Sequence, residues 1–279
     1  MGLETKNFVR DMNLPRDRHE ILKKATADLT SDENVRAIYL GGSLAKGNYD
    51  NYSDIDLHII VEDASLVDFI RYKRQRALNW GNVLFFEDSH PDSPVVVAHF
   101  DSFVKADTWY KTAGQIQPSI WLKGLEVLYD PKDILKDVFE ESSKIAFVID
   151  AEAVDFWKGK ILAFYHETYR AAMRKEWYYA LANLDRVRWL IADGWYMEAG
   201  NHLDSAYGVW SKVEGERSLL NDQQLSLLAK WNCKRETEEI LAALSIMYPE
   251  VMRLYTVLHK KAGLEADEER FREIIEMVL

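Results

Sequence analysis

Two aspartates separated by one residue are the side chains of this sequence whose types and spacing most clearly point to chemistry. Asp54 and Asp56 lie in the run SDIDLHII at 53–60, whose β-branched residues predict a strand. Residues two apart on a strand project from the same face, so the two carboxylates would point the same way, about 7 Å apart. Convergent carboxylates repel each other unless a cation binds them, and their hard oxygen atoms favour Mg²⁺ or Mn²⁺.

A glycine-rich turn precedes this strand. The run Val35–Leu40 predicts a short strand that leads into Gly41, Gly42 and Ser43, and ten residues separate Ser43 from Asp54. Glycines allow backbone amides to approach a phosphate closely, and the serine adds a hydroxyl group. A carboxylate pair suited to a metal, next to a turn suited to phosphate, predicts phosphoryl or nucleotidyl transfer.

With these motifs, the sequence resembles the nucleotidyltransferase superfamily of the DNA polymerase beta type. The resemblance rests on Leu40-Gly41-Gly42-Ser43 followed by Asp54-Ile55-Asp56-Leu57, and it covers about residues 30–135. It implies that Gly42 and Ser43 contact a triphosphate, that Asp54 and Asp56 bind catalytic metal ions, and that a later strand supplies a third carboxylate. The whole layout looks like that of the antibiotic nucleotidyltransferases acting on aminoglycosides and lincosamides.

The third carboxylate implied by the resemblance is Asp107 or Asp101. The sequence predicts a strand over Val95–Phe100, a hairpin turn at Asp101-Ser102 and a strand over Phe103–Tyr110 that contains Asp107. Aspartate is common in turns for conformational reasons alone. The pattern therefore favours Asp107 as a metal ligand, although its neighbours are smaller than the family's usual apolar residues, and Asp101 stays open as the alternative.

Other side chains are candidates near such a site. Lys46 could contact the triphosphate from the turn, and a solvated loop lysine is an equal alternative. His58 faces the same side as Asp56, where a hydrogen-bonded sheet histidine is the favoured interpretation. Glu167 is the first choice of catalytic base to deprotonate an acceptor hydroxyl. The other carboxylates considered for that role are Glu176, Asp185 and Glu198.

The elements expected around these residues alternate between strand and helix up to about residue 150 and are helical beyond it. Further strands are expected at Ile55–Val61 and Asn82–Glu87, and helices at Pro15–Leu29, Ala64–Trp80 and after Asp130-Pro131. The later helices are expected at Ala151–Lys175, Trp177–Asp193, Met197–Lys212, Asp222–Trp231, Glu236–Met247 and Pro249–Ala262. We therefore predict an α+β fold, with a mixed-sheet nucleotidyltransferase domain over 1–145, followed by an all-α helical bundle over 146–279 that binds substrate.

Composition limits the function classes. The chain has 279 residues, 48% of them hydrophobic, and a formal net charge of −11, which argues against duplex DNA and mildly favours cationic partners. The longest stretch without a charged residue, 112–122, is too short to cross a bilayer. Met1–Arg10 has no apolar segment typical of a secretory signal, and Cys233 is the single cysteine, so no disulfide framework is expected. We expect a cytoplasmic protein.

The combined expectation is a Mg²⁺-dependent (or Mn²⁺-dependent) nucleotidyltransferase that moves AMP from ATP, or another nucleoside monophosphate from its triphosphate, to a hydroxyl of a small molecule. An aminoglycoside-like antibiotic is one candidate acceptor. The expected partners are the nucleoside triphosphate and the acceptor, with no membrane and no duplex DNA, and a homo-oligomer is compatible with the sequence. The alternatives are an antitoxin-like enzyme that transfers AMP to a protein and a catalytically lapsed nucleotide-binding protein.

Overall fold

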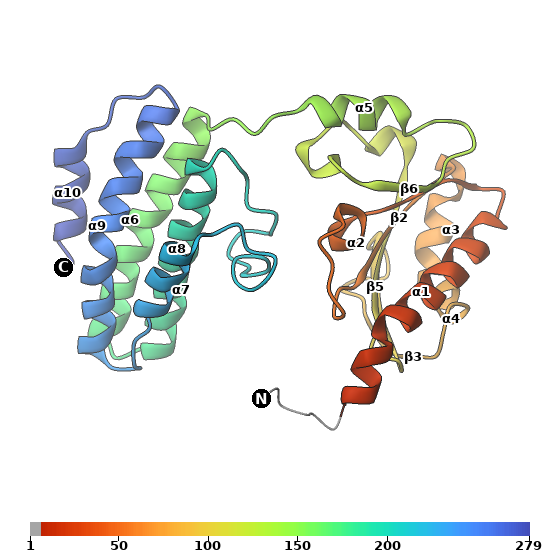
Figure 1. The fold of residues 1–279 in the computed structure, drawn as a ribbon, viewed down its shortest axis with the longest axis horizontal. Helices are drawn as coiled ribbons and strands as arrows, with labels where there is room; N and C mark the ends of the chain where they lie inside the picture. The colour runs from red at the N-terminus through yellow and green to blue at the C-terminus, as the bar shows by residue number, and fades with distance from the viewer. Residues whose placement is uncertain (1–6) are drawn as a thin grey trace. The chain divides into compact units, whose positions relative to one another are not determined.

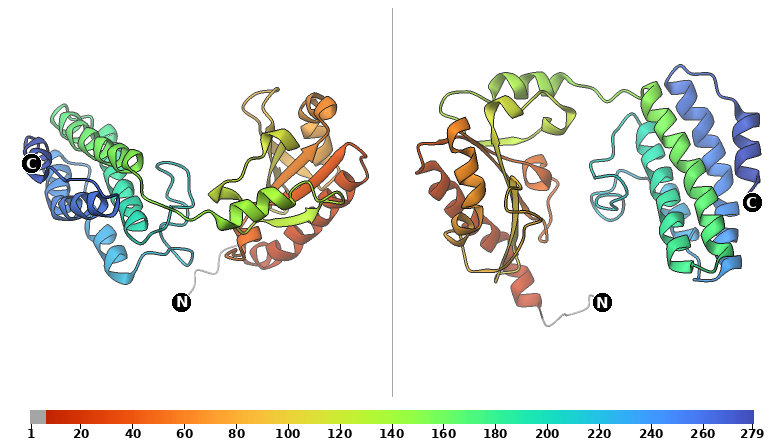
Figure 2. Two further views of the ribbon diagram at one scale, coloured as in Figure 1. Left: turned by 90° about the horizontal axis from the view of Figure 1, so that it is seen from above. Right: turned by 180° about the vertical axis from the view of Figure 1, so that it is seen from behind.

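Contacts between residues divide the chain into two units, Met1–Ala146 (unit 1) and Phe147–Leu279 (unit 2). The structure is a computed structural model that describes residues 7–279, and Figures 1 and 2 show each unit from three sides. Residues 1–6, which form part of the stretch expected to lack a secretory signal, lie outside the described residues.

A six-stranded mixed sheet forms the centre of unit 1. Its strands are β1 (Val35–Leu40), β2 (Ile55–Val61), β3 (Val83–Glu87), β4 (Val95–Phe100), β5 (Lys105–Thr112) and β6 (Glu126–Tyr129). Their order in the sheet is β3-β4-β5-β2-β1-β6, with β2 and β5 parallel and the other neighbours antiparallel. The expected strands are confirmed, and β6 is an additional strand that the sequence analysis did not identify.

Helices cover both faces of this sheet. They are α1 (Phe8–Thr30), α2 (Gly42–Lys46), α3 (Leu66–Arg71), α4 (Lys73–Leu78) and α5 (Lys136–Lys144), with short 3₁₀ turns at Asp63–Ser65, Ala113–Gln115 and Ile120–Leu122. The single helix expected over Ala64–Trp80 is wrong, because the chain bends at Tyr72 between α3 and α4. The helix expected after Asp130-Pro131 begins later, at Lys136.

The larger core of unit 1 lies between the sheet and helices α1, α3 and α4. Buried residues of α1 recur at the three- and four-residue spacing of one helix face, as Leu14, Arg18, Ile21, Ala25 and Leu29. They pack against the inner face of the sheet together with residues of α3 and α4, and Figure 1 shows these helices along one side of the sheet. The opposite face has a much smaller core under α5, built around Tyr39 and Ile60. Part of that second face is therefore free to carry polar side chains.

Unit 2 is all-helical. It contains α6 (Ala151–Met173), α7 (Trp177–Glu198), α8 (Asp222–Lys230), α9 (Thr237–Lys261) and α10 (Glu268–Glu276), with α6, α7 and α9 packed on one another. The mixed sheet followed by helices is the fold class predicted from the sequence.

Two helix predictions in unit 2 are wrong. Residues 199–220 are irregular, not a helix over Met197–Lys212, because Gly200 and Gly208 take left-handed φ values of 77° and 72°. The two helices expected on either side of Tyr248 form one helix, α9, which runs through Pro249. Pro249 is exposed, so water can bond to the carbonyl that its missing N–H leaves free.

Aromatic side chains fill much of the core of unit 2. Trp157 is 1% exposed and donates its indole N–H to the carbonyl of Leu190 at 2.7 Å. Trp195 is 2% exposed and stacks on Trp231. Tyr178, by contrast, is 75% exposed.

Helix α9 is, among the residues that the structure describes, the one helix long and apolar enough to span a membrane by length and composition. Its apolar residues lie in the core of unit 2, where Ile240, Leu244 and Leu254 are fully buried. Packing within the bundle therefore accounts for its hydropathy.

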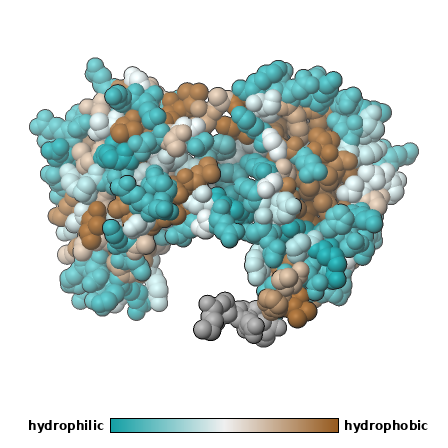
Figure 3. All heavy atoms as spheres, in the orientation of Figure 1, coloured by the Kyte–Doolittle hydropathy of each residue, from teal (hydrophilic) through white to brown (hydrophobic). Residues whose placement is uncertain are grey.

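In unit 1, Phe8, Val9 and Met12 are more than half exposed, and Figure 3 shows an apolar patch at that end of α1.

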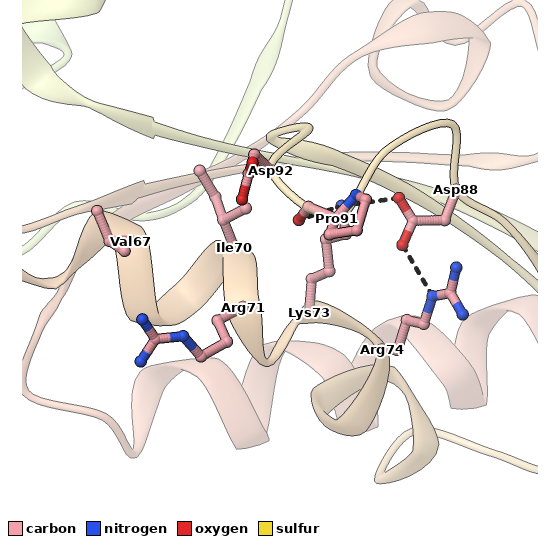
Figure 4. A pocket seen from close by; sticks show the side chains of 8 residues that line it. All are labelled: Val67, Ile70, Arg71, Lys73, Arg74, Asp88, Pro91 and Asp92. Atoms are coloured by element: carbon pink, nitrogen blue, oxygen red, sulfur yellow. Dashed lines mark hydrogen bonds and ion pairs between the residues drawn. The ribbon is translucent and has the colours of Figure 1, made fainter.

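A buried ion pair fastens the loop between β3 and β4 to α4. The ammonium of Lys73 lies 2.8 Å from Asp88, and both side chains are almost fully buried. It also donates to the carbonyls of His90 and Ser93 at 3.0 and 2.7 Å. Figure 4 shows Lys73 and Arg74 both directed at Asp88, whereas Arg71 points away.

Replacing Lys73 with methionine is expected to lower the free energy of unfolding of unit 1 by about 3 kcal/mol, because Asp88 and the loop carbonyls lose a buried partner. The exposed pair of Arg71 with Asp68 gives a matched control, and Arg71→Met should cost less than about 0.5 kcal/mol. Urea unfolding of the full chain measures both. Equal effects would show that the buried pair is not a fastening point.

Candidate functional site

Three carboxylates meet at one end of the sheet. Strands β2 and β5 run parallel with Asp56 opposite Asp107, and Asp54 lies just before β2. One oxygen from each of Asp54, Asp56 and Asp107 lies within 4.8 Å of the other two, and all three residues are partly exposed. Side chains two apart on each strand share a face, so the register of two neighbouring strands is what brings the three groups together.

The structure separates the two candidates for the third carboxylate. Asp107 lies within β5 and belongs to the cluster. Asp101 lies in the hairpin turn between β4 and β5, where it accepts a hydrogen bond from Asn82 at 2.9 Å. The geometry therefore favours Asp107, and its role as a metal ligand stays a prediction.

The glycine turn lies directly against Asp56. Gly41 donates its backbone N–H to the carbonyl of Asp56 at 2.8 Å. Gly42 takes a φ of +58°, and a Cβ built on it would lie 1.7 Å from the Asp56 carboxylate. A side chain at residue 42 would displace the carboxylate, so the turn needs glycine both for its backbone conformation and for its closeness to Asp56.

The remaining residues of the turn lie in the short helix α2. Ser43 is buried, at 3% exposed, and Lys46 is the last residue of α2, before Gly47 with a left-handed φ of 71°. Gly42 and Lys46, which are partly exposed, are therefore more accessible from solvent than Ser43. The triphosphate roles of Gly42, Ser43 and Lys46 stay predictions.

Arg18 of α1 holds the loop that presents Asp54. Its side chain is 5% exposed and donates to the carbonyls of Asp50 and Ser53 at 3.0 and 2.8 Å. Burial lowers the pKa of this guanidinium, and the charges of Tyr49 and Asp50 oppose that shift. An arginine stays protonated in any case, so Arg18 is a fixed cation under the loop.

Lys105 supplies a positive charge inside the carboxylate cluster. Its ammonium lies 2.6 Å from Asp54 and 3.1 Å from Asp107. Burial lowers the pKa of Lys105, but the hydrogen bonds and charges of the two aspartates outweigh that effect and raise it. Burial raises the pKa of Asp107 against the opposing charge of Lys105, and the negative charges of Asp54 and Glu87 raise it further.

His58 lies beside the cluster as an uncharged packing residue. Its ring stacks between Tyr39 and Trp109, with centroid distances of 4.6 and 4.5 Å. Burial lowers the pKa of His58 to about 3 and the charge of Lys111 adds to the shift, so the ring is neutral near neutral pH. The favoured sequence interpretation, a structural sheet histidine, fits this position, although stacking holds the ring more than hydrogen bonding does.

The carboxylates considered as a catalytic base lie in unit 2. Glu167, on α6, forms ion pairs within unit 2 with Arg170 and Arg174 at 3.4 and 3.2 Å. The other candidates are also engaged, Glu176 with Arg174, Asp185 with Arg188 and Glu198 with Arg253. Asp193, on α7, differs from them, because burial raises its pKa to about 6. The base role of Glu167 stays a prediction.

Arg18 and Lys105 are the site residues that sequence reasoning missed. Arg18 occupies the apolar stripe of α1, where a charged residue signals a specific buried partner. Lys105 stands two residues before Asp107 and shares its strand face. Both signals are visible only after the strand and helix faces have been assigned correctly.

The donor set fits a hard divalent cation. Three carboxylates with ligand oxygens inside 4.8 Å match the preference of Mg²⁺ and Mn²⁺ for oxygen. Asp54 and Asp56 would come from β2 and Asp107 from β5. The ammonium of Lys105 already neutralises part of their charge. A bound metal ion would therefore either share the carboxylates with this ammonium or displace it from them.

Comparison with known proteins finds a family match within unit 1. Residues 20–145 match the family model of the nucleotidyltransferase domain. This part of the chain is therefore a nucleotidyltransferase domain, as the motif at residues 40–57 predicted. No curated protein matches the sequence.

Two solved structures are distantly similar to the chain. An aminoglycoside 6-adenyltransferase from Bacillus subtilis is 13% identical, with 94% of this chain and 98% of that chain covered and a TM-score of 0.43. A nucleotidyltransferase-like protein from Exiguobacterium sibiricum is 10% identical, with 88% and 77% covered and a TM-score of 0.41. Likenesses of this size do not bear on activity.

Replacing Lys105 with methionine is expected to lower stability without divalent ions by about 1 kcal/mol, since the pair is partly exposed. The same change should increase the rise in melting temperature that Mg²⁺ produces, because the metal no longer competes with an ammonium. Calorimetry with and without MgCl₂ measures both effects. Lys111→Met on the same strand is the control, and an equal Mg²⁺ effect in all three proteins would contradict the competition.

Gly42→Ala is expected to weaken Mn²⁺ binding at least about tenfold and to destabilise unit 1, because the methyl group displaces the Asp56 carboxylate. Gly47→Ala separates strain from crowding, since Gly47 also has positive φ but open space around it. That control should cost about 1 kcal/mol and leave metal binding unchanged. Electron paramagnetic resonance of free Mn²⁺ gives the affinities, and matching losses in the two variants would refute the crowding argument.

Proposed function

We propose that this protein is a Mg²⁺-dependent nucleotidyltransferase that moves a nucleoside monophosphate, AMP from ATP, to a hydroxyl group of a small molecule. The observation that carries the proposal is the cluster of Asp54, Asp56 and Asp107 beside the Gly41–Gly42 turn, within a nucleotidyltransferase domain. Nucleotidyl transfer needs carboxylates that hold a metal ion and, next to them, a turn that binds phosphate.

Each part of the site has a role in this proposal. Asp54 and Asp56, with Asp107 on the side of β5, would hold the metal ion. The backbone of Gly42 and Ser43, with Lys46, binds the two outer phosphates. Bound Mg²⁺ would supply Lewis-acid polarisation and charge neutralisation at the phosphate being transferred.

The proposed reaction is a single displacement at the α-phosphorus. The acceptor oxygen forms a bond to that phosphorus, the bond from phosphorus to the α–β bridging oxygen breaks, and pyrophosphate leaves with the bonding electrons. The hydroxyl proton passes to a carboxylate base, for which Glu167 is the sequence candidate, or to solvent.

Two alternatives differ from this proposal in the acceptor or in the loss of catalysis. A protein-modifying enzyme would use the same site on a side-chain hydroxyl of another protein. A lapsed enzyme would bind nucleotide without transfer, and the presence of all three carboxylates argues against it. Substrate binding by unit 2 and a cytoplasmic location remain expectations from the sequence.

Each of the substitutions Asp54→Asn, Asp56→Asn and Asp107→Asn is expected to reduce AMP transfer by at least about a hundredfold, because it removes a charged metal ligand. Asp101→Asn is the matched control and should keep at least half the activity, since the Asp101 carboxylate accepts a hydrogen bond from Asn82 and lies outside the carboxylate cluster. Transfer is measured with α-labelled ATP and MgCl₂, by separating label on small molecules from label on protein.

The pattern of outcomes discriminates the alternatives. Label on protein would favour the protein-modifying enzyme, and Mg·ATP binding without any transfer would favour the lapsed one. Unchanged turnover in Asp54→Asn or Asp56→Asn would refute the proposed site. Loss of transfer in Asp101→Asn but not in Asp107→Asn would make Asp101 the third metal ligand in place of Asp107.

A further inference from the structure

An apolar pocket of about 430 Å³ borders the carboxylate cluster, with Asp54 and Lys105 in its wall. Its other lining residues come from α1, from the loop before β2, from β3 and β4, and from the hairpin turn that leads into β5. In the strand order, β5, β4 and β3 lie on one side of β2, and β1 with the glycine turn lies on the other. The pocket and the glycine turn therefore flank the carboxylates from opposite sides.

Large apolar side chains are unusually exposed in this pocket. Leu84, Phe85 and Phe103 line it and are 64%, 54% and 60% exposed. Packing in unit 1 gains little from them, because their surface stays in contact with water. Exposed aromatic surface that gathers in a concave site next to convergent polar groups is typical of a ligand pocket.

Phe103 is held in this position against its own backbone preference. It takes a φ of +70° in the hairpin turn, a conformation that a bulky side chain rarely adopts. The guanidinium of Arg10 lies over its ring at 3.9 Å. Strain of this kind persists where the surrounding structure imposes it, and it gathers at sites of function.

Phe85 belongs to a row of side chains that leads to the cluster. In the sheet register Phe85 pairs with His99, and His99 pairs with Lys105. The ring of His99 stacks on Phe85 at 4.1 Å, and Lys105 contacts Asp54. A continuous row on one face of the sheet therefore leads from Phe85 through His99 to Lys105, next to the proposed reacting centre.

The direction of the reaction indicates which substrate would lie in the pocket. In phosphoryl transfer the attacking oxygen and the leaving oxygen stand roughly in line across the phosphorus. If pyrophosphate leaves toward the glycine turn, the hydroxyl attacks from the opposite side, which is the side of β5. The pocket lies on that side, so it is placed for the acceptor and not for the leaving group.

We propose that this pocket binds the acceptor, and that the acceptor is a hydroxylated small molecule with an aromatic or similarly flat apolar ring and no cluster of positive charges. The inference rests on the proposed function, since it takes Asp54, Asp56 and Asp107 as the reacting centre. The ring lies against Phe85 and Phe103, and the hydroxyl reaches the carboxylates past Lys105.

The charges of the pocket fit this class of acceptor and oppose a polycation. Asp54 is the single carboxylate among the residues that line it, and Arg18 and Lys105 are cations there. A polycationic aminoglycoside needs several carboxylates around it, and the lining of this pocket offers Asp54 alone, already paired with Lys105. The acidic composition of the chain favours such an acceptor, but Asp56 and Asp107 of the carboxylate cluster do not line this pocket.

Equilibrium binding of umbelliferone, a fluorescent hydroxylated aromatic compound, to the full chain tests the proposal. Fluorescence anisotropy should show saturable binding that Phe85→Ala and Phe103→Gly each weaken by about tenfold, the loss expected for one aromatic contact. Tyr72→Ala removes an aromatic ring that is 51% exposed but does not line the pocket, and it should bind as the unchanged protein does.

Competition identifies the occupant. Neither streptomycin, a polycation, nor a non-hydrolysable ATP analogue with Mg²⁺ should displace umbelliferone. Displacement by streptomycin would overturn the acceptor class, and competitive displacement by the ATP analogue would overturn the acceptor assignment in favour of the nucleotide base. Absence of saturable binding, or equal binding in all variants, would overturn the pocket itself.

Stability and a second set of variants keep these outcomes separate from the fate of the proposed function. Phe103→Gly relieves the left-handed backbone, so its melting temperature should equal or exceed that of the unchanged protein while its binding falls. Asp56 does not line the pocket, so umbelliferone binding to Asp56→Asn reports on the pocket separately from catalysis. If Asp56→Asn transfers AMP as the unchanged protein does, the proposed function fails while the pocket stands. If transfer depends on Asp56 but the phenylalanine variants bind umbelliferone normally, the pocket fails while the proposed function stands.

Discussion

The repulsion between three carboxylates at one end of the sheet is the constraint on which the rest of unit 1 depends. Asp54, Asp56 and Asp107 approach within 4.8 Å, an arrangement that is unfavourable without a positive charge. Lys105 provides that charge from β5, and the buried guanidinium of Arg18 fixes the loop before Asp54. The glycines of the turn leave room for Asp56. The clustered carboxylates that suit metal binding thus lower the stability of unit 1, and the ammonium of Lys105 reduces that cost.

Local patterns in the sequence were sufficient to predict the central strands. β1, β2 and β4 have the expected bounds, because β-branched runs bounded by turn residues leave few other conformations. The motif at residues 40–57 also predicted the nucleotidyltransferase domain that the family match confirms. The choice of Asp107 over Asp101 needed the strand face as well as the pattern, and the structure places Asp107 in the cluster.

Features that depend on distant contacts could not be predicted in this way. Arg18 and Lys105 gain their partners only when α1 and β5 are in place. The sequence can show that Arg18 interrupts an apolar stripe, but not which groups either cation contacts. The sequence predicts a helix over Met197–Lys212, yet the segment 199–220 is irregular, and hydrogen bonds of Trp189, Tyr196 and Trp210 join it to α7. Continuation of α9 through Pro249 likewise depends on packing that outweighs a local penalty.

The parallel pairing of β2 with β5 has a consequence for how the site comes into being. Asp56 and Asp107 face each other only through this pairing, and α3, α4, β3 and β4 lie between them along the chain. Contacts between residues so far apart in sequence form late, because a long loop must close before they are rewarded. A nascent chain therefore carries Asp54 and Asp56 as ordinary solvated acids until Thr112 has been made. The crowded site appears as one event, when β5 docks and brings Asp107 and its neutralising lysine together.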